Sequence, residues 1–377
     1  MYKSFRVKNF RCFKDLQIND LGRVNLIAGK NNTGKTALME AMYILSGNRE
    51  AKTLIRRNLR TIYRLSWDSD QQDSPDFASD IISWTIMFRN HESKNEIALD
   101  ALLTEPLLPL FPESNALSLK IRKMPNDSAD FDDTLYKFRI GDFASFGHSE
   151  LLEFESEHNS RKEHLLLVDG NVVGLRSSSN TDIVAEFLSA GEKQGARISA
   201  KRFSDLRRRG DTSILCDTLI VIDPRLKGVE LLYDGYRTLM FADLGLDQLK
   251  PLLEPLTSLG EGIQRVASLT LAMTDHSIRM VFIDEIEHGL HHSVQCQVWK
   301  AIGKLARELN IQVFATTHSL EMIRAAYEAF SSDGKLDEFR YHRLDRDAET
   351  DDIEAVTYNE LDLNAVAAFD FDFEVRG

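Results

Sequence analysis

The sequence predicts an α/β protein with a mixed or parallel core sheet, an antiparallel β subdomain and a helical insertion. Near the N-terminus the apolar run Val24–Ala28 is followed by a helical pattern over Ala37–Leu45. Near the C-terminus two further apolar runs, Arg279–Ile283 and Ile311–Ala315, flank another helical pattern. Strands alternating with helices are typical of a sheet with parallel strands. The middle of the chain instead has short strands between polar turns, which indicates antiparallel structure.

Composition excludes several classes of protein. The chain has 377 residues, 43% apolar and 28% charged, which suits one large domain or two small ones. Its three cysteines, Cys12, Cys216 and Cys296, are far apart and form no C-x-x-C pair, which argues against a disulfide framework or a zinc site. The N-terminus lacks the apolar core of a signal peptide, and no apolar run reaches the roughly 18–20 residues of a membrane span. We therefore expect a cytoplasmic protein that does not contact membranes.

Residues 1–50 are predicted to form the N-terminal part of the core. Residues 2–8 alternate as a short strand, and a second strand at Gln17–Ile18 fits the pattern. Val24–Ala28 has the pattern of a buried strand. The helix over Ala37–Leu45 places its apolar side chains at a spacing of about 3.6 residues.

Residues 51–210 are predicted to form the β subdomain and the helical insertion. Short strands are expected at Ser83–Phe88, Glu96–Leu102, Ala116–Ile121, Leu135–Ile140 and His164–Val168. Residues 181–210 have a helical pattern that ends in three arginines and a glycine.

Residues 211–330 are predicted to complete the core. The expected elements are strands at Val229–Tyr233, Thr238–Ala242, Arg279–Ile283 and Ile311–Ala315, and helices at Ile263–Met273 and Val294–Leu309. Residues 331–377 are an acidic C-terminal extension, with 14 Asp or Glu against 4 Lys or Arg between Asp333 and Glu374. We interpret this extension as a solvated surface.

A phosphate-binding loop follows the first apolar strand. Gly29 to Thr36 match the pattern G-x-x-x-x-G-K-[ST]. The glycines let backbone N–H groups face the phosphates, Lys35 reaches the β- and γ-phosphates, and the Thr36 hydroxyl ligates Mg²⁺. The residues expected to contact the nucleotide here are Gly29, Asn31, Asn32, Thr33, Gly34, Lys35, Thr36 and Ala37. We therefore predict binding of a magnesium–nucleotide complex.

An acidic pair ends the strand Met280–Ile283. Asp284 is expected to hold Mg²⁺, and Glu285 to polarise the attacking water. Both follow a buried strand whose carboxyl end faces the ligand crevice of an α/β sheet. The next residues, Ile286–His292, contain one glutamate and three histidines. A metal cluster is an alternative interpretation of these side chains.

Two more segments fit a nucleotide site. The strand Ile311–Ala315 leads to His318, which is expected to lie beside Glu285 and to hydrogen-bond the γ-phosphate and the water. A glycine-containing turn opens the helix at Ile263–Met273, and free N–H groups at a helix start bind anions. Its candidate contact residues are Gly260, Glu261, Gly262 and Arg265.

The order of these motifs resembles the ABC-type ATPase heads of the RecF, SMC and OLD (overcoming lysogenization defect) families. The opening Phe5–Asp15 is similar to their N-terminal strand and turn, and Ser258–Arg265 to a degenerate signature motif. The strand with Asp284 and Glu285 resembles Walker B, and Ile286–His292 resembles the D-loop. The segment Thr316–Ser319 resembles the switch histidine motif. The resemblance implies an ABC-ATPase-like P-loop head whose substrate is ATP and whose cofactor is Mg²⁺.

It also implies a homodimer, in which two heads close head to tail around two ATP molecules. Each ATP would lie between Lys35 of one chain and Gly260–Gly262 of the other. Gly260 stands where the signature normally has serine, so backbone groups would contact the γ-phosphate. Gln71 and Gln72 are weak candidates for the glutamine that normally links Mg²⁺ to the subdomain. No long heptad segment for an SMC-type coiled coil is present.

Three functions are compatible with these residues. The leading hypothesis is an ATPase that controls a separate effector, such as a nuclease in anti-phage defence. OLD nucleases carry a TOPRIM domain, whereas 59 residues follow His318 and the D-x-D at Asp370–Asp372 is near the end. We therefore expect no DNA cleavage by this chain alone. A second hypothesis is a RecF-like DNA clamp, and a third is a nucleotide-loaded scaffold with little turnover. The basic residues that favour DNA binding are Lys201, Arg202, Arg207, Arg208, Arg209 and the arginines of 56–64.

Overall fold

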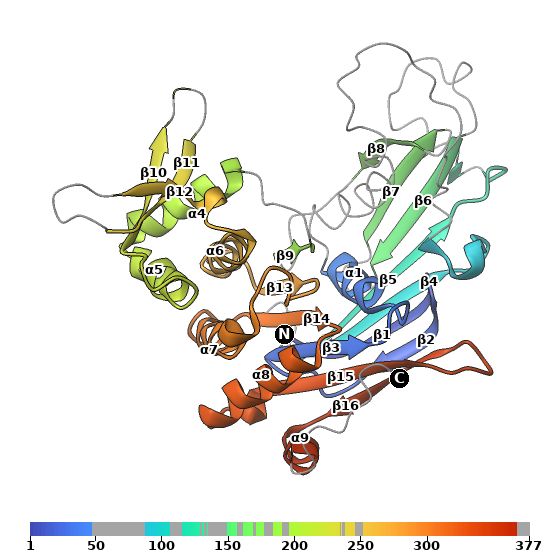
Figure 1. The fold of residues 1–377 in the computed structure, drawn as a ribbon. Coiled ribbons are helices and arrows are strands. Elements are labelled where there is room, and N and C mark those ends of the chain that lie inside the picture. Colours follow the sequence, from blue (N-terminus) through green and yellow to red (C-terminus); the bar gives the residue numbers. More distant parts are fainter. Residues whose placement is uncertain are drawn as a thin grey trace.

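The computed structural model describes most of the chain. Described are residues 1–46, 87–105, 115–128, 130–131, 134, 149–156, 161–168, 171–176, 184–190, 196–233, 235, 238–245 and 252–367. Within them three sheets are formed (Figure 1). The predicted α/β class is confirmed.

The core sheet has six strands in the order β16-β15-β3-β14-β13-β9. Their bounds are β3 Val24–Gly29, β9 Ala185–Leu188, β13 Met280–Ile283, β14 Gln312–Thr317, β15 Phe339–Arg346 and β16 Ile353–Tyr358. All neighbours are parallel except β15 and β16, which are antiparallel. In this register Ile283 pairs with Ala315, and Thr317 with Ala28. The carboxyl ends of β3, β13 and β14 therefore meet at one edge of the sheet.

Both faces of the core sheet are buried, which explains why β3, β13 and β14 consist mainly of apolar residues. Val281 and Ile283 of β13 point into a core shared with helices α6 (Glu261–Met273), α7 (His292–Glu308) and α8 (Leu320–Ser332). Met280 and Phe282 point into a second core shared with α1 (Lys35–Leu45). In that core the rings of Phe187, Phe282 and Phe314 stack in a row across three strands.

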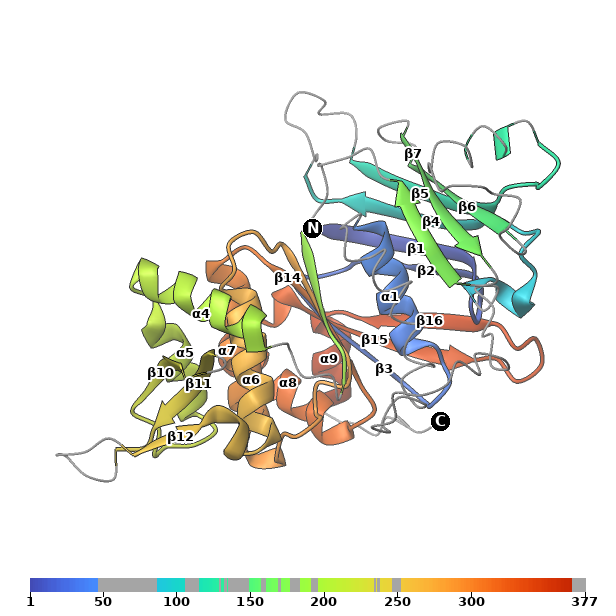
Figure 2. The same cartoon turned by 90° about the horizontal axis from the view of Figure 1, so that it is seen from above.

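The antiparallel sheet has seven strands in the order β2-β1-β4-β5-β6-β7-β8. Their bounds are β1 Tyr2–Phe10, β2 Phe13–Ile18, β4 Ile97–Leu103, β5 Ala116–Lys123, β6 Ser149–Ser156, β7 Arg161–Val168 and β8 Asn171–Arg176; the short helix η2 spans Arg89–His91. Helix α1 contacts strands of both this sheet and the core sheet. Figure 2 shows α1 between them. The helix that follows the phosphate loop is thus held from two sides.

A third, smaller group of elements lies on the other side of the core sheet (Figure 1). It comprises α4 Ala196–Arg209, α5 Thr212–Ile220, the three-stranded sheet of β10 Gly228–Tyr233, β11 Thr238–Asp243 and β12 Leu253–Pro255, and the short helix η5 Leu256–Ser258. Helix α6 packs against α4 and α5. The chain ends, as far as it is described, with the short helix η6 Leu336–Glu338, the β15–β16 hairpin and α9 Glu360–Ala367.

Several predicted elements need correction. The segment expected to be helical over 181–210 begins with β9, which forms an edge of the core sheet, before α4 starts at Ala196. Strands β6 and β8 were not expected. The acidic extension is not only solvated surface, because β15 lies beside β3 inside the core sheet, with Phe339 and Tyr341 fully buried. The strands expected at 135–140 and over 83–86 lie outside the described residues.

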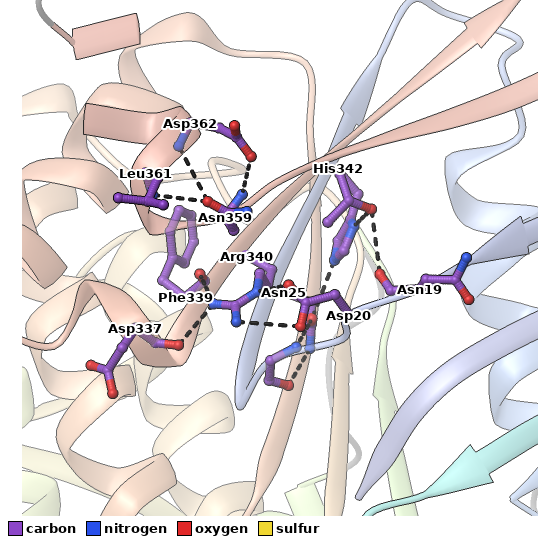
Figure 3. A network of polar contacts seen from close by, with 12 residues as sticks. Asn19, Asp20, Asn25, Asp337, Phe339, Arg340, His342, Asn359, Leu361 and Asp362 are labelled. Atoms are coloured by element: carbon purple, nitrogen blue, oxygen red, sulfur yellow. Dashed lines mark hydrogen bonds and ion pairs between the residues drawn. The ribbon is translucent and has the colours of Figure 1, made fainter. Parts of the chain in front are cut away.

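His342 on β15 is the most deeply buried histidine of the described chain, with no exposed surface. Asn25 Nδ2 donates to two carbonyls, so its Oδ1 accepts from His342 Nε2 at 3.2 Å. Nδ1 lies 2.9 Å from Thr357 Oγ1, and the Thr357 hydroxyl also lies 3.5 Å from Asn19 O. Figure 3 shows this network beside the ion pair of Arg340 with Asp20. Burial, with a smaller effect of Arg340, lowers the pKa of His342 to about 3.

Because His342 is buried in its neutral form, we expect the stability of the fold to decrease at mildly acidic pH. Between about pH 6.5 and 3 the unfolded chain binds a proton that folded His342 excludes, so the free energy of unfolding falls as the pH falls through this window. We expect a loss of about 2 kcal/mol between pH 7 and pH 5, measured by urea denaturation. His342→Gln should flatten this dependence. The exposed His276 supplies the control His276→Gln, which should leave the slope unchanged. An equal slope in wild type and His342→Gln would contradict the prediction.

Candidate nucleotide site

The phosphate loop lies between β3 and α1, where the prediction placed it. Gly34 precedes the helix with φ 84°, and a Cβ there would lie 2.5 Å from Cys12 Sγ and 2.8 Å from Phe13 Cζ. Only glycine therefore fits this position. The helical hydrogen bonds begin with Leu38 N–H to Gly34 O. The N–H groups of Lys35, Thr36 and Ala37 have no acceptor within the helix, which is the arrangement that binds phosphate.

The rest of the loop is fixed by contacts at its base. Thr33 is buried, and its hydroxyl donates to Lys30 O at 2.9 Å. Arg346, from the end of β15, donates to Asn32 O at 2.8 Å. Asn31 and Asn32 are exposed. The β15–β16 hairpin thus supports the loop, a connection that the sequence did not reveal.

Lys35 has its ammonium group at this loop. Its Nζ donates to Gly29 O at 2.7 Å and to Lys30 O at 2.8 Å. Partial burial lowers the pKa of Lys35, and the negative charges of Glu287, Asp284 and Glu285 oppose that shift. The cation therefore sits in a partly desolvated position beside three carboxylates, where its charge acts strongly on an anion.

Thr36 and Asp284 are 248 positions apart in sequence and are brought into direct contact. The Thr36 hydroxyl lies 3.0 and 3.1 Å from the two oxygens of Asp284. One hydroxyl and one carboxylate at the start of the helix form a donor set that suits Mg²⁺, which prefers oxygen ligands and takes the remainder from phosphate and water. The two residues predicted to hold the metal are therefore brought together.

Glu285 is exposed at the same edge of the sheet and has the left-handed φ of 47°. Its N–H donates to Thr316 Oγ1 at 2.8 Å, and Thr316 Oγ1 in turn donates to Asp284 Oδ1 at 2.6 Å. A glutamate with positive φ is strained and persists only when its surroundings hold it there. The fully buried Thr316 supplies that hold for both acidic residues.

His318 follows β14 and is half exposed. Its backbone N–H and its ring Nδ1 both lie 2.9 Å from Glu287 Oε1. The Glu287 side chain is 12% exposed, and its Oε2 is buried without a hydrogen-bond partner in the described part of the chain. His318 is thus attached to the loop that follows β13, next to the acidic pair.

The turn before α6 is open to solvent. Gly260 is exposed with φ 102°, and a Cβ there would meet no heavy atom within 4 Å. Gly262 packs closely on Gly289, and Glu261 lies 3.6 Å from His288. Among the described residues no hydrogen bond or ion pair joins Gly260–Gly262 to the phosphate loop. The structure therefore does not bring this predicted contact to the nucleotide site of the same chain.

For Arg265 the sequence allows two roles, neutralising phosphate charge or bracing the loop, and its contacts within the chain are those of a brace. Its guanidinium donates to Ser189 O at 2.6 Å and also to Leu188 O and Asp284 O. Burial lowers the pKa of Arg265, opposed by the nearby Asp284, Glu285 and Glu287. A guanidinium committed to three carbonyls braces the ends of β9 and β13 instead of reaching a phosphate.

The histidines that follow Glu285 do not share one partner. His288 pairs with Glu261, whereas His291 caps α7 by accepting from Ser293 N–H through Nδ1. His292 is the first residue of that helix. Within the ranges that the structure describes, no group of three or more His, Cys, Asp or Glu side chains is placed to hold a metal ion.

Two site residues, Thr316 and Glu287, were missed by the sequence analysis. Thr316 lies in the Thr316–Ser319 motif, and a hydroxyl at the end of a buried strand was a usable signal. Glu287 was noted only as a member of the histidine-rich segment. The candidates Gln71 and Gln72, the arginines of 56–64 and the D-x-D at 370–372 lie outside the described residues.

Thr316 can be tested directly. Thr316→Val keeps the shape of the side chain but removes the hydroxyl that joins Glu285 N–H to the Asp284 carboxylate. Two partly exposed polar groups, the Glu285 N–H and the Asp284 carboxylate, then lose a hydrogen-bond partner, which costs at most about 1–3 kcal/mol each. We expect the rate of ATP hydrolysis to fall by roughly one to two orders of magnitude in a steady-state phosphate-release assay, by analogy with other lost positioning contacts. Thr316→Ser should restore most of the rate, and a fully active valine variant would contradict this role.

The basic cluster on α4 is largely engaged within the chain. Arg202 pairs with Glu186, and Arg208 with Asp205. Arg209 donates to Thr274 O at 2.6 Å. Lys201 and Arg207 are exposed. The charge available for a nucleic acid on this face is therefore smaller than the sequence suggested.

Two ATPase family models and several curated proteins are similar to parts of this chain. A family model described as an AAA ATPase domain matches residues 1–184. A second model, described as an AAA domain of the AbiEii toxin and type IV toxin–antitoxin kind, matches residues 223–324. An ATP/GTP phosphatase of Helicobacter pylori is 23% identical over 364 residues, covering 86% of each chain. The RecF protein of Clostridioides difficile is 38% identical over 66 residues, 16% of this chain and 18% of that protein.

Solved structures show the same fold. An Smc head bound to the C-terminal winged-helix domain of ScpA has a TM-score of 0.50 at 10% identity, covering 95% of this chain and 98% of that one. An Smc head with an extended coiled coil, bound to the C-terminal domain of ScpA from Pyrococcus furiosus, has a TM-score of 0.51 at 11% identity. The match covers 100% of this chain and 99% of that one. Together with the joined phosphate loop and acidic strand, these matches support an ABC-type P-loop ATPase whose fold is that of an Smc head.

Proposed function

We propose that this ATPase works as a head-to-tail homodimer that closes around two ATP molecules and opens after hydrolysis. The observation that carries the proposal is the open start of α6. Gly260 faces free space, and the first hydrogen bond of the helix is Gln264 N–H to Gly260 O. The N–H groups before Gln264 have no helical acceptor, so the turn is suited to an anion from outside the chain. A γ-phosphate held by a second copy has the matching chemistry.

The described residues support a simple division of roles in hydrolysis. Lys35 and the N–H groups at the start of α1 bind the β- and γ-phosphates. Bound Mg²⁺, held by Thr36 and Asp284, would neutralise phosphate charge. Glu285 orients and polarises a water for attack on the γ-phosphorus, the bond to the bridging oxygen breaks, and ADP and phosphate form. His318 hydrogen-bonds the transferred phosphoryl group.

We further propose that the ATP-dependent closure controls a separate effector, such as a nuclease of an anti-phage system. A ligand that binds the closed pair more tightly than the open heads shifts their equilibrium by that difference in affinity. A DNA clamp is the second candidate, favoured by the short RecF matches and by the exposed Lys201 and Arg207.

No described helix is long and apolar enough to cross a membrane.

One experiment tests both candidates. ATP turnover and molar mass are measured for the purified chain with ATP, with ADP and without nucleotide, each with and without duplex DNA. Turnover with an ATP-dependent doubling of mass supports the dimer switch. Stimulation by DNA that disappears at high salt favours the clamp. ATP binding with neither turnover nor a change of mass would reject the switch and leave a nucleotide-loaded scaffold.

A further inference from the structure

Glu287 is a carboxylate of the site that belongs neither to the phosphate loop nor to the acidic pair, and it has no role assigned so far. It comes from the loop after β13, three residues beyond Asp284, and its side chain is largely buried. One oxygen, Oε1, receives both the backbone N–H and the ring Nδ1 of His318 at 2.9 Å. A single acceptor oxygen thereby fixes both the position of the backbone after β14 and the orientation of the His318 ring.

Glu287 interacts electrostatically with two cations of the site. Lys35 and Arg265 are the cations on which its negative charge acts, one from the phosphate loop and one from α6. Among the three carboxylates near Lys35, Glu287 has the largest effect. Glu287 therefore interacts both with the cation of the phosphate loop and with the imidazole of His318.

The contact determines which ring nitrogen of His318 carries hydrogen. An ionised carboxylate can only accept hydrogen bonds, so Nδ1 must be protonated to meet Oε1. The other nitrogen, Nε2, is then the one available to a ligand. It is a lone-pair acceptor in the neutral ring and a donor in the imidazolium.

We propose that Glu287 is a positioning residue that holds the His318 ring with its proton on Nδ1 and presents Nε2 to the terminal phosphate. The role of Nε2 rests on the proposed hydrolytic function, whereas the choice of tautomer does not. Carboxylates that orient a histidine through its second nitrogen are used in this way in other active sites. Glu287 acts through His318 and does not itself contact the reacting atoms.

The tautomer can be measured without nucleotide. In protein labelled with ¹⁵N-histidine at pH 8, the wild-type signal of His318, assigned by its loss in His318→Gln, should show a protonated Nδ1 and an unprotonated Nε2. Glu287→Ala removes the acceptor, and we expect the ring to change to the Nε2–H form. Glu287→Gln keeps an oxygen acceptor and should retain the Nδ1–H form. Glu321→Gln changes another carboxylate close by, which binds the Ser319 hydroxyl, and should leave the His318 signals unchanged.

Kinetics give the second measurement. Glu287→Ala should lower kcat for ATP about 10- to 100-fold, with a change in KM below about threefold, and Glu287→Gln should lie between it and the wild type. Circular dichroism melting checks that each variant is folded. An unchanged His318 tautomer in a folded Glu287→Ala protein would overturn the proposal. If the wild type hydrolyses no ATP, the proposed function fails, while the tautomer measurement still decides the role of Glu287.

Discussion

Replacement of Lys35 by alanine is expected to abolish ATP hydrolysis and to weaken ATP binding. The ammonium lies over the phosphate loop within hydrogen-bond distance of Gly29 O and Lys30 O, so a short movement transfers it to a phosphate oxygen. Charge-assisted hydrogen bonds contribute about 1.5–3 kcal/mol each. Loss of this group should therefore raise the Kd for ATP by about 10- to 100-fold, measured by isothermal titration calorimetry. Turnover should fall further, because the transition state carries more charge at the transferred group.

The neighbouring lysine provides a matched control. Lys30 is exposed and contributes only its backbone oxygen to the contacts of the loop. Lys30→Ala removes the same charge from the same loop, so it should leave the Kd and turnover close to those of the wild type. Equal losses in the two variants would show that net positive charge matters, and not the position of Lys35. Normal turnover in Lys35→Ala would reject the phosphate loop as the hydrolytic site.

The core of the fold could be predicted from the sequence because its central strands are buried on both faces. Such strands appear in the sequence as mainly apolar runs, and the runs Val24–Ala28, Arg279–Ile283 and Ile311–Ala315 each contain a strand of the core sheet. The order of the strands could not be predicted. Contact between Thr36 and Asp284 requires β14 to lie between β3 and β13. That neighbour relation depends on pairing between distant segments.

The errors share a physical cause. Strand β15 contains charged residues, such as Arg343, which pairs with the nearby Asp345, and Arg340, which pairs with the distant Asp20. Its composition therefore resembles a solvated surface, although Tyr341 is fully buried. Strand β9 has only four residues and precedes a long helix, which hides it from a periodicity argument. Strand β6 was missed because acidic residues interrupt its apolar pattern, and one of them, Glu153, is buried against Arg122.

In the site, too, residues marked by a local sequence pattern were predicted, whereas residues that depend on distant partners were not. Residues whose chemistry depends on a local pattern, such as Lys35, Thr36 and the acidic pair, were found from that pattern. Thr316 and Glu287 bridge separate strand ends, and although the Thr316 hydroxyl stands at the end of an apolar strand, the partners of both side chains are set by the fold. Arg265 was assigned to the nucleotide because it opens a helix near glycines. Its carbonyl partners lie 76 and 77 positions back in the chain, which only the fold brings near.

Replacement of Glu285 by glutamine is expected to stop turnover while ATP remains bound. Glutamine has the same shape, so the backbone bond from residue 285 to Thr316 Oγ1 and the metal-binding pair of Thr36 and Asp284 should persist. The amide cannot accept a proton from the attacking water. The loss of such a general base lowers rates by about 10²- to 10⁴-fold. Single-turnover hydrolysis of radiolabelled ATP measures this loss directly, and the exposed Glu349 on the β15–β16 hairpin supplies the control Glu349→Gln.

The same variant tests the dimer. If the start of α6 of one chain binds the γ-phosphate held by the other, ATP that is not hydrolysed keeps the two heads closed. Glu285→Gln should then elute with ATP at twice the monomer mass of 42.9 kDa, and with ADP as the monomer. Loss of turnover without the larger species would keep Glu285 as the base and reject the head-to-tail closure. Unchanged turnover would instead remove Glu285 from catalysis. In that case the proton would have to go to another group at this sheet edge, where Glu287 is the nearest carboxylate in sequence that does not bind Thr36.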